Sequence, residues 1–393
     1  MNILVTDGNS RASLAITRSL GAKGHRLYVA NHASPSLASC SRYCYQALTY
    51  PDPARDRTAF LETILQLISD HDIDVLIPVA DICVLPVAEA IDIFEKKCHI
   101  PIPSYNSLKQ AADKNGLLVT ANDLNVAVPR SVSVNSFDEF RITETDLSSP
   151  IVIKPGRSRV ESTSGWIYTH VDYANSADEL HSKLRALPQV AYPVILQERI
   201  TGHGIGMFYC FNHGEPVASF SHKRIREKPP SGGVSVLCES AHLHPQADEF
   251  SQKLLRKLNW HGVAMVEFKL DERDQTPKLM EINGRFWGSL QLAINSGVDF
   301  PDLLLQITER KHAFAAEPYK TGVRSRWFWG EVDLLLMHLL KKRKSLNLPA
   351  GHDNRLLSII KILNPFVRNQ HFDVLRLSDL KPWIHESMQR LKT

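Results

Sequence analysis

The chain has 393 residues and a formal net charge of +4 at pH 7. That length exceeds what one hydrophobic core usually serves and predicts two or three domains. Hydrophobic residues make up 43% and charged residues 22%, as in ordinary globular proteins, and the small net charge argues against nucleic acid as a partner. The six cysteines form no C-x-x-C pair, and no apolar run reaches the roughly 18–20 residues that span a bilayer. With no signal peptide evident, we expect a cytoplasmic protein with reduced thiols and no structural metal on cysteine.

Strand and helix patterns alternate through the first hundred residues. We expect strands over residues 2–6, 25–30 and 73–79, with helices between and after them. Such alternation predicts a doubly wound parallel sheet. The first turn lacks the G-x-G-x-x-G spacing of dinucleotide sites, so NAD binding is not expected. This turn, at residues 7–11, and Asp81 fall at strand carboxyl ends, where substrate pockets form.

Two later strand-like runs, residues 263–270 and 278–285, carry a candidate metal site. If Glu267 lies opposite Glu281, the loop between the strands has about five residues, an ordinary hairpin length. Alternation places Glu281 and Asn283 on the same face. Two carboxylates and an amide oxygen then form a hard-oxygen set that suits Mg²⁺ bound to phosphates.

Arg285 continues the same face and could neutralise phosphoryl charge. Taken alone, the pattern E-x-N-x-R is more typical of solvated polar residues at the edge of a sheet than of a metal site. The surrounding sequence favours a magnesium-nucleotide site over solvated edge residues.

The flanking run at residues 286–301 resembles the ATP-grasp superfamily. It is most similar to the carbamoyl-phosphate-synthase-like branch, in which E-(I/V)-N-x-R-(F/W) closes the metal site; Gly284 stands where members usually have Pro. The resemblance extends from the N-terminus to about Pro301. It implies an α/β and α+β fold with three parts: a pre-ATP-grasp domain (1–108), an ATP-grasp domain (109–312, lid subdomain about 125–196) and a C-terminal helical extension (313–393).

The strand over residues 150–155 ends in Lys154, and a lysine in so apolar a strand is expected to point at an anion. The glycine-rich and hydroxyl-rich loop that follows, at residues 156–165, could fold over phosphates or be a plain hairpin turn. The resemblance implies ATP contacts from two lysines, the adenine segment and this loop. They are Lys114, Lys154, Gln197, Glu198, Ile200, Ser164 and Gly165. The ribose contact is unassigned, because residues 202–206 lack the acidic residue that many ATP-grasp enzymes have there.

Four basic residues, His222, Lys223, Arg224 and Arg226, precede a Pro-Pro-Ser-Gly-Gly turn. A nucleic-acid patch would need interleaved aromatic residues, which are absent here, and a solvated strand is the common explanation of such a run. By resemblance it is the loop that faces the γ-phosphate and the carboxylate. We therefore nominate Lys223 and Arg226, with Arg226 favoured for stabilising an acyl phosphate. The N–H groups of residues 231–233 could hold a substrate carboxylate.

Residues 327–344 form an amphipathic helix pattern that ends in a basic cluster. Such a helix could lie on an anionic membrane surface. We favour the alternative, in which its apolar face packs on its own domain and the cations suit the helix dipole. A loop over residues 345–354 and a short strand and helix over 371–382 are expected to follow, and this tail could cap the substrate side.

These features together predict an ATP-dependent carboxylate–amine ligase. ATP with Mg²⁺ (or Mn²⁺) would convert a small-molecule carboxylate to an acyl phosphate, which an amine would attack. A bicarbonate-activating or carbamoyl-phosphate-type enzyme would use the same metal residues. A nucleotide-binding regulatory protein of a polysaccharide or secondary-metabolite pathway is a further alternative. The sequence leaves the oligomeric state open, and a homodimer is one candidate.

Overall fold

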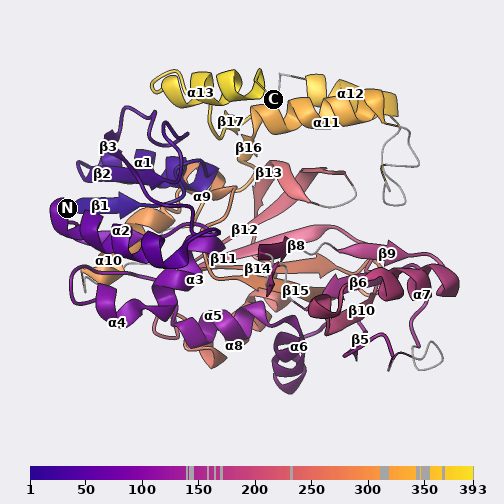
Figure 1. Ribbon diagram of the computed structural model, residues 1–393. Helices are drawn as coiled ribbons and strands as arrows, with labels where there is room; N and C mark the ends of the chain where they lie inside the picture. The colour runs from indigo at the N-terminus through magenta and orange to yellow at the C-terminus, as the bar shows by residue number, and fades with distance from the viewer. Residues whose placement is uncertain are drawn as a thin grey trace.

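The computed structural model describes residues 1–138, 140, 146–156, 159–162, 165–168, 171–230, 233–309, 318–341, 346, 355–364 and 368–392. Three sheets and a small hairpin make up its β structure (Figure 1). The three sheets are the N-terminal sheet, a four-stranded lid sheet and a seven-stranded sheet. The C-terminal helices lie along one side of the molecule. The mixed α/β fold expected from the sequence is confirmed.

The N-terminal sheet is parallel, with strand order β3-β2-β1-β4. Its strands are β1 (Asn2–Val5), β2 (Arg26–Asn31), β3 (Cys44–Thr49) and β4 (Val75–Ile77). Helix α1 (Arg11–Ala22) begins where the Ser10 side chain accepts a hydrogen bond from a backbone N–H of the first turn, and Asp56 does the same for α2 (Arg57–Asp70). Strand β3 was not predicted, because its side chains are mostly exposed and form no apolar run.

The helix expected after β4 is present but interrupted. Helix α3 (Asp81–Glu89) starts at the acidic residue that follows the strand, and α4 (Ile91–Phe94) is a separate short helix. A carboxylate in the first turn is favoured by the helix dipole. Asp81 is therefore a helix-initiating residue at the edge of the sheet. The chain then continues through α5 (Tyr105–Ala112) and α6 (Lys114–Asp123).

The lid sheet is antiparallel and has the order β5-β10-β6-β9. Its strands are β5 (Ser131–Val134), β6 (Ile151–Pro155), β9 (Asp172–Ala174) and β10 (Val194–Glu198), and α7 (Ala177–Ala186) packs against them in a separate small core. Strands β7 (Arg159–Ser162) and β8 (Gly165–Tyr168) form a hairpin that begins in the predicted phosphate loop and extends beyond it.

The seven-stranded sheet has the order β15-β14-β11-β12-β13-β16-β17. Five of its strands run antiparallel: β11 (Gly204–Asn212), β12 (Glu215–Lys228), β13 (Val234–Ala241), β14 (Gly262–Leu270) and β15 (Pro277–Asn283). Helix α8 (Pro245–Lys257) buries one apolar face, while α9 (Leu290–Ser296) and α10 (Phe300–Thr308) share a core with α1 and the N-terminal sheet.

The C-terminal segment contains the short strand expected near residue 371 and adds a second strand that was not predicted. Strands β16 (Arg324–Arg326) and β17 (Gln370–Phe372) extend the seven-stranded sheet, and α11 (Phe328–Leu340), α12 (Arg355–Leu363) and α13 (Lys381–Arg390) lie outside it (Figure 1). A buried ion pair ties this segment to α1: Arg18 Nε is 2.8 Å from Asp379 Oδ2, and both side chains are 2% exposed. No described helix is long and apolar enough to cross a membrane.

Candidate active site

A cavity of about 880 Å³ lies between the lid sheet, the seven-stranded sheet and helices α11 and α12. Nine of the residues nominated from the sequence line it: Lys154, Gln197, Glu198, Ile200, Arg226, Glu267, Glu281, Asn283 and Arg285. Lys114 and Lys223 are not among its lining residues. Ser164 lies outside the described residues, and Gly165 begins β8.

The β14–β15 hairpin has the register that the sequence predicted. Glu267 pairs with Glu281 across the two strands, and Met265 pairs with Asn283. The Asn283 amide donates to Glu281 Oε1 at 2.9 Å, which turns the amide oxygen towards Arg285. Burial, together with the nearby Glu281 carboxylate, raises the pKa of Glu267 despite the opposing guanidinium of Arg224.

Two facing carboxylates with a third oxygen donor fit a hard divalent cation. Among the described residues there is no cluster of three or more His, Cys, Asp or Glu side chains of metal-binding kind. A magnesium site here would therefore rest on Glu267, Glu281 and the amide oxygen of Asn283, completed by phosphate oxygens and water.

The N-terminal domain reaches this site through two residues. Asp81, at the start of α3, accepts a hydrogen bond from Arg285 Nε at 2.8 Å. Arg11, at the start of α1, lines the cavity and pairs with Asp373 at 2.5 Å. Of the strand ends at which the sequence analysis expected a pocket, the first turn thus contributes Arg11 to the cavity wall, whereas Asp81 contacts the cavity-lining Arg285.

Lys154 and Lys114 lie on the opposite side, near Glu281. Lys154 is in β6 of the lid sheet, and burial lowers its pKa to about 8, although Glu281 opposes that shift. Lys114 is the first residue of α6, and its pKa is also lowered by burial and supported by Glu281. A lysine at the positive end of a helix is electrostatically unfavourable unless an anion is close. Both positions are therefore suited to a phosphate group next to Glu281.

The lid strand β10 supplies the segment nominated for adenine. Gln197 is buried, and its side-chain amide donates to Ser131 Oγ at 2.9 Å. The Glu198 carboxylate accepts the backbone N–H of Arg130 at 2.9 Å and pairs with Arg273 at 3.2 Å. Burial would raise the pKa of Glu198, but these donors outweigh it and lower the pKa. The carboxylate of Glu198 is thus engaged in joining strands, and its backbone N–H also donates to Arg130 O at 2.9 Å.

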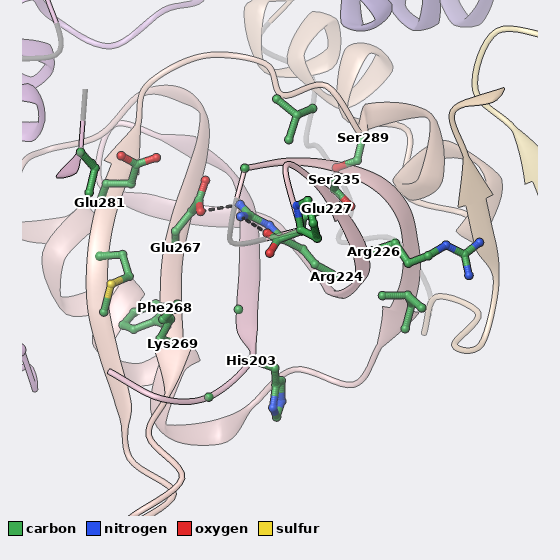
Figure 2. Close-up of a pocket in the computed structure, with 18 of the residues that line it drawn as sticks. His203, Arg224, Arg226, Glu227, Ser235, Glu267, Phe268, Lys269, Glu281 and Ser289 are labelled. Atoms are coloured by element: carbon green, nitrogen blue, oxygen red, sulfur yellow. Dashed lines mark hydrogen bonds and ion pairs between the residues drawn. The ribbon is translucent and has the colours of Figure 1, made fainter. Parts of the chain in front are cut away.

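The two basic residues nominated on β12 do not converge on the carboxylates. Lys223 forms an ion pair with Glu239 at 2.7 Å and is absent from the cavity lining. Arg226 lines the cavity but binds both carboxylate oxygens of Glu331 on α11, at 2.8 and 3.0 Å. In Figure 2 its side chain points away from Glu267.

Arg224, which was not nominated, makes the central contact instead. Its guanidinium forms an ion pair with Glu267 and a second one with Glu227 at 2.9 Å (Figure 2). Strand β11 lies between β12 and β14, so the side chain must cross it. Gly204 and Gly206 leave that path open: a Cβ on Gly204 would lie 3.7 Å from Arg224 Cδ. The G-x-G pattern of β11 was the sequence feature that could have indicated a side chain crossing this strand.

His222 is a buried neutral residue and adds no positive charge to the run in which it was counted. It is 1% exposed, and burial lowers its pKa to about 3. Its ring stacks on Phe208 with centroids 4.6 Å apart, and Nε2 lies 3.0 Å from the hydroxyl of Ser289. The structure therefore presents the Ser289 hydroxyl at the cavity wall.

Residues 192–330 match the family described as "ATP-grasp in the biosynthetic pathway with Ter operon". No curated protein matches the sequence. The resemblance to ATP-grasp proteins drawn from the sequence is confirmed, and the structural relatives show how far the fold extends.

Three solved structures share the fold at low sequence identity. An L-amino acid ligase from Bacillus licheniformis has a TM-score of 0.61 at 16% identity, covering 78% of this chain and 73% of the relative. N5-carboxyaminoimidazole synthetase from Staphylococcus aureus, complexed with ADP, has a TM-score of 0.61 at 15% identity, covering 80% and 79%. A biotin carboxylase–β,γ-ATP complex from Campylobacter jejuni has a TM-score of 0.63 at 13% identity, covering 82% and 74%. The chain thus shares its fold with these proteins, and residues 192–330 match the ATP-grasp family model.

Proposed function

We propose that this protein is an ATP-dependent ligase that activates a small-molecule carboxylate as an acyl phosphate and joins it to an amine. The facing pair of Glu267 and Glu281, with Asn283 beside it and Lys154 opposite, carries the proposal. Two of the three structural relatives are complexes with a nucleotide, which supports ATP as the phosphoryl donor.

The proposed roles follow from position and charge. Glu267, Glu281 and Asn283 would hold Mg²⁺, which when bound would neutralise phosphate oxygens and polarise the transferred group. Lys154 and Lys114 would hold the phosphates from the lid side. Arg285, fixed by Asp81, would oppose charge that develops on the transferred phosphoryl group.

The far half of the cavity is where the carboxylate would bind. Its wall comes from β12 and the C-terminal helices and includes Arg226, His338 and Lys361. Arg224 lies between the two halves, held by Glu267 and Glu227. When a cation binds Glu267, Arg224 would be released towards an incoming carboxylate, and the ion pair would thus be exchanged without leaving a charge unpaired.

The test measures ADP and phosphate release from Mg-ATP against pooled amino acids and other carboxylates, with and without amines. Stimulation by one carboxylate–amine pair, with ADP and an amide as products, is the expected result. Stimulation by bicarbonate alone would instead assign the chain to the carboxylating alternative, and AMP as product would contradict acyl-phosphate chemistry. Tight ATP binding without turnover on any pool would favour the regulatory alternative.

A further inference from the structure

Arg11 of the N-terminal domain lines the active-site cavity with a guanidinium that the protein uses only in part. Its Nη1 lies 2.5 Å from Asp373 Oδ2, and the Arg11 side chain is 12% exposed. Its Nε and Nη2 make no hydrogen bond to any residue that the structure describes. Because a guanidinium presents several N–H donors in one plane, those of Nε and Nη2 are left for a ligand in the cavity.

The Arg11 guanidinium lies against the chain at Gly288. A Cβ on Gly288 would come within 3.0 Å of Arg11 Nη2, so the glycine leaves room for the arginine. Gly288 stands between Trp287 and Ser289, and all three residues line the cavity. The Ser289 hydroxyl, at the cavity wall in Figure 2, is 3.0 Å from Nε2 of the buried His222. The guanidinium and the hydroxyl therefore meet the cavity at neighbouring positions of one loop.

Positive charge exceeds negative charge on the wall next to Arg11. Helix α11 packs on its own domain through Leu334, which shares a small core with Val236 of β13. The two carboxylates of α11 are each shared between two cations. They are Glu331, with Arg226 and Arg326, and Asp333, with Lys228 and Arg390. Four cations for two carboxylates leave part of the positive charge unbalanced.

Lys228 shows that this charge extends to Arg11. Lys228 and Arg11 both lie over the Trp327 ring, 4.9 and 4.3 Å from its centroid. Burial and the nearby charges of Arg390 and Arg11 lower the pKa of Lys228. Glu386 accepts the Trp327 indole N–H at 2.8 Å, but burial raises the pKa of Glu386 and so disfavours its ionised form. An anionic group at Arg11 would therefore be stabilised.

We propose that Arg11 and Ser289 bind a second carboxylate of the substrate, so that the acid which the protein activates is a dicarboxylic acid. This inference rests on the proposed ligase function, in which the reacting carboxylate lies beside Arg224 and the metal site. A carboxylate matches the paired donors of a guanidinium, and a monocarboxylic acid would leave them without a partner. The phosphates of ATP do not account for Arg11, because their proposed place is on the lid side next to Lys154.

Calorimetry on the full chain tests the second carboxylate site, in the presence of Mg²⁺ and a non-hydrolysable ATP analogue. Each dicarboxylic acid is compared with a monocarboxylic acid of the same chain length: succinate with butyrate, glutarate with pentanoate, aspartate with 2-aminobutyrate and glutamate with norvaline. At least one dicarboxylic acid should bind about tenfold or more tightly than its match.

Two variants test whether that preference depends on the residues named. Arg11→Gln should weaken binding of the preferred dicarboxylic acid by about tenfold or more. Its affinity for the matched monocarboxylic acid and for the ATP analogue should stay as in the wild type. Ser289→Ala should show the same selectivity with a smaller loss, about threefold or more, because only one hydroxyl donor is removed.

Arg42→Gln is the matched control. Arg42 also joins the N-terminal domain to the C-terminal segment, since its Nη1 donates to Ser378 O at 3.1 Å, but it is not among the described residues that line the cavity. This variant should bind every acid as the wild type does. Three results would overturn the proposal: no dicarboxylic acid that binds more tightly than its match, an equal loss for both acids in Arg11→Gln, or the same selective loss in Arg42→Gln.

Product analysis separates this proposal from the proposed ligase function. Arg11-dependent binding of a dicarboxylic acid without ADP release, whatever amine is added, would support the carboxylate site and contradict the ligase. ADP release that a monocarboxylic acid stimulates equally in the wild type and in Arg11→Gln would support the ligase and contradict the second carboxylate site.

Discussion

Arg224 on β12 reaches across the glycines of β11 to form an ion pair with Glu267 on β14. The contact joins a cation from the substrate half of the cavity to a carboxylate of the candidate metal site. Both side chains are shielded from solvent, with 17% and 19% exposed. Removing one partner of such a pair leaves the other charge poorly solvated.

Replacing Arg224 by glutamine should lower the free energy of unfolding by about 1–3 kcal/mol in the absence of Mg²⁺. Glu267 would then face Glu281 without its ion-pair partner. Urea unfolding measures the change. Arg256→Gln is the control, because Arg256 is 3.7 Å from Glu215 in a well-exposed pair and should cost at most about 1 kcal/mol. Equal effects of the two substitutions would show that the Arg224–Glu267 contact does not stabilise the protein.

The glycines of β11 provide a matched pair of substitutions. A Cβ on Gly206 would lie 2.7 Å from Phe208 Cζ, and that ring is held between His222 and Trp287. Gly206→Ala should therefore destabilise the protein by about 1–3 kcal/mol through overpacking. Gly204→Ala meets only Arg224 Cδ, at 3.7 Å, and should be tolerated. Thermal unfolding of both variants tests this, and Gly206→Ala is expected to have the lower melting temperature. The reverse order would contradict the packing described for this strand.

Lys154 gives a pH dependence whose sign can be worked out. Burial lowers its pKa to about 8, whereas the pKa of a lysine in an unfolded chain is about 10.4. Since the unfolded state binds this proton more tightly, the contribution of Lys154 to stability should increase as the pH rises from about 8 to about 10.4. The difference in unfolding free energy between the wild type and Lys154→Met should follow that course. A difference that is flat over this range would contradict the lowered pKa.

The same group predicts proton uptake on ATP binding. A phosphate beside Lys154 favours the charged form, so at about pH 8.5 binding should draw a proton from the buffer. Calorimetry in buffers of different ionisation enthalpy measures that proton. Lys154→Arg is the control, because arginine keeps the charge without titrating in this range. It should retain binding and lose the uptake, and equal uptake in both proteins would assign the proton to another group.

Arg226 and Glu331 can be tested as a structural pair. The two oxygens of Glu331, whose side chain is 3% exposed, accept Arg226, and one of them also accepts Arg326. A double-mutant cycle of Arg226→Ala and Glu331→Ala should give a coupling of about 0.5–3 kcal/mol in unfolding free energy. If Arg226 instead contacts the acyl phosphate, Arg226→Lys should lower kcat with little loss of stability. A coupling near zero would favour that catalytic role.

Local pattern was sufficient to predict the β14–β15 hairpin. Strand alternation and a short loop place Glu267 opposite Glu281, and both depend only on neighbouring sequence. The same alternation did not identify the central cation of β12. Register shifts between Arg224 and Arg226, and between Arg226 and Glu227, change which side chains share a face.

The contact of Arg224 with Glu267 also depends on the order of the strands. Their partnership requires β11 to lie between β12 and β14 with glycine at the crossing, which is a non-local property. Likewise, the pairing of Arg285 with Asp81 joins residues 204 positions apart in the sequence. The sequence predicted that each would lie near a pocket; the fold brings them into contact, and Arg285 is the one that lines the cavity.

The most direct test of the proposed site is calorimetric binding of a non-hydrolysable ATP analogue with and without Mg²⁺. The account predicts Mg²⁺-dependent binding by the wild type and a loss of affinity of about tenfold or more in Glu281→Gln. Glu249→Gln, an exposed glutamate on α8, should bind as the wild type does. Equal affinity with and without Mg²⁺, or an unaffected Glu281→Gln variant, would contradict the assignment of Glu267, Glu281 and Asn283 as the metal-nucleotide site.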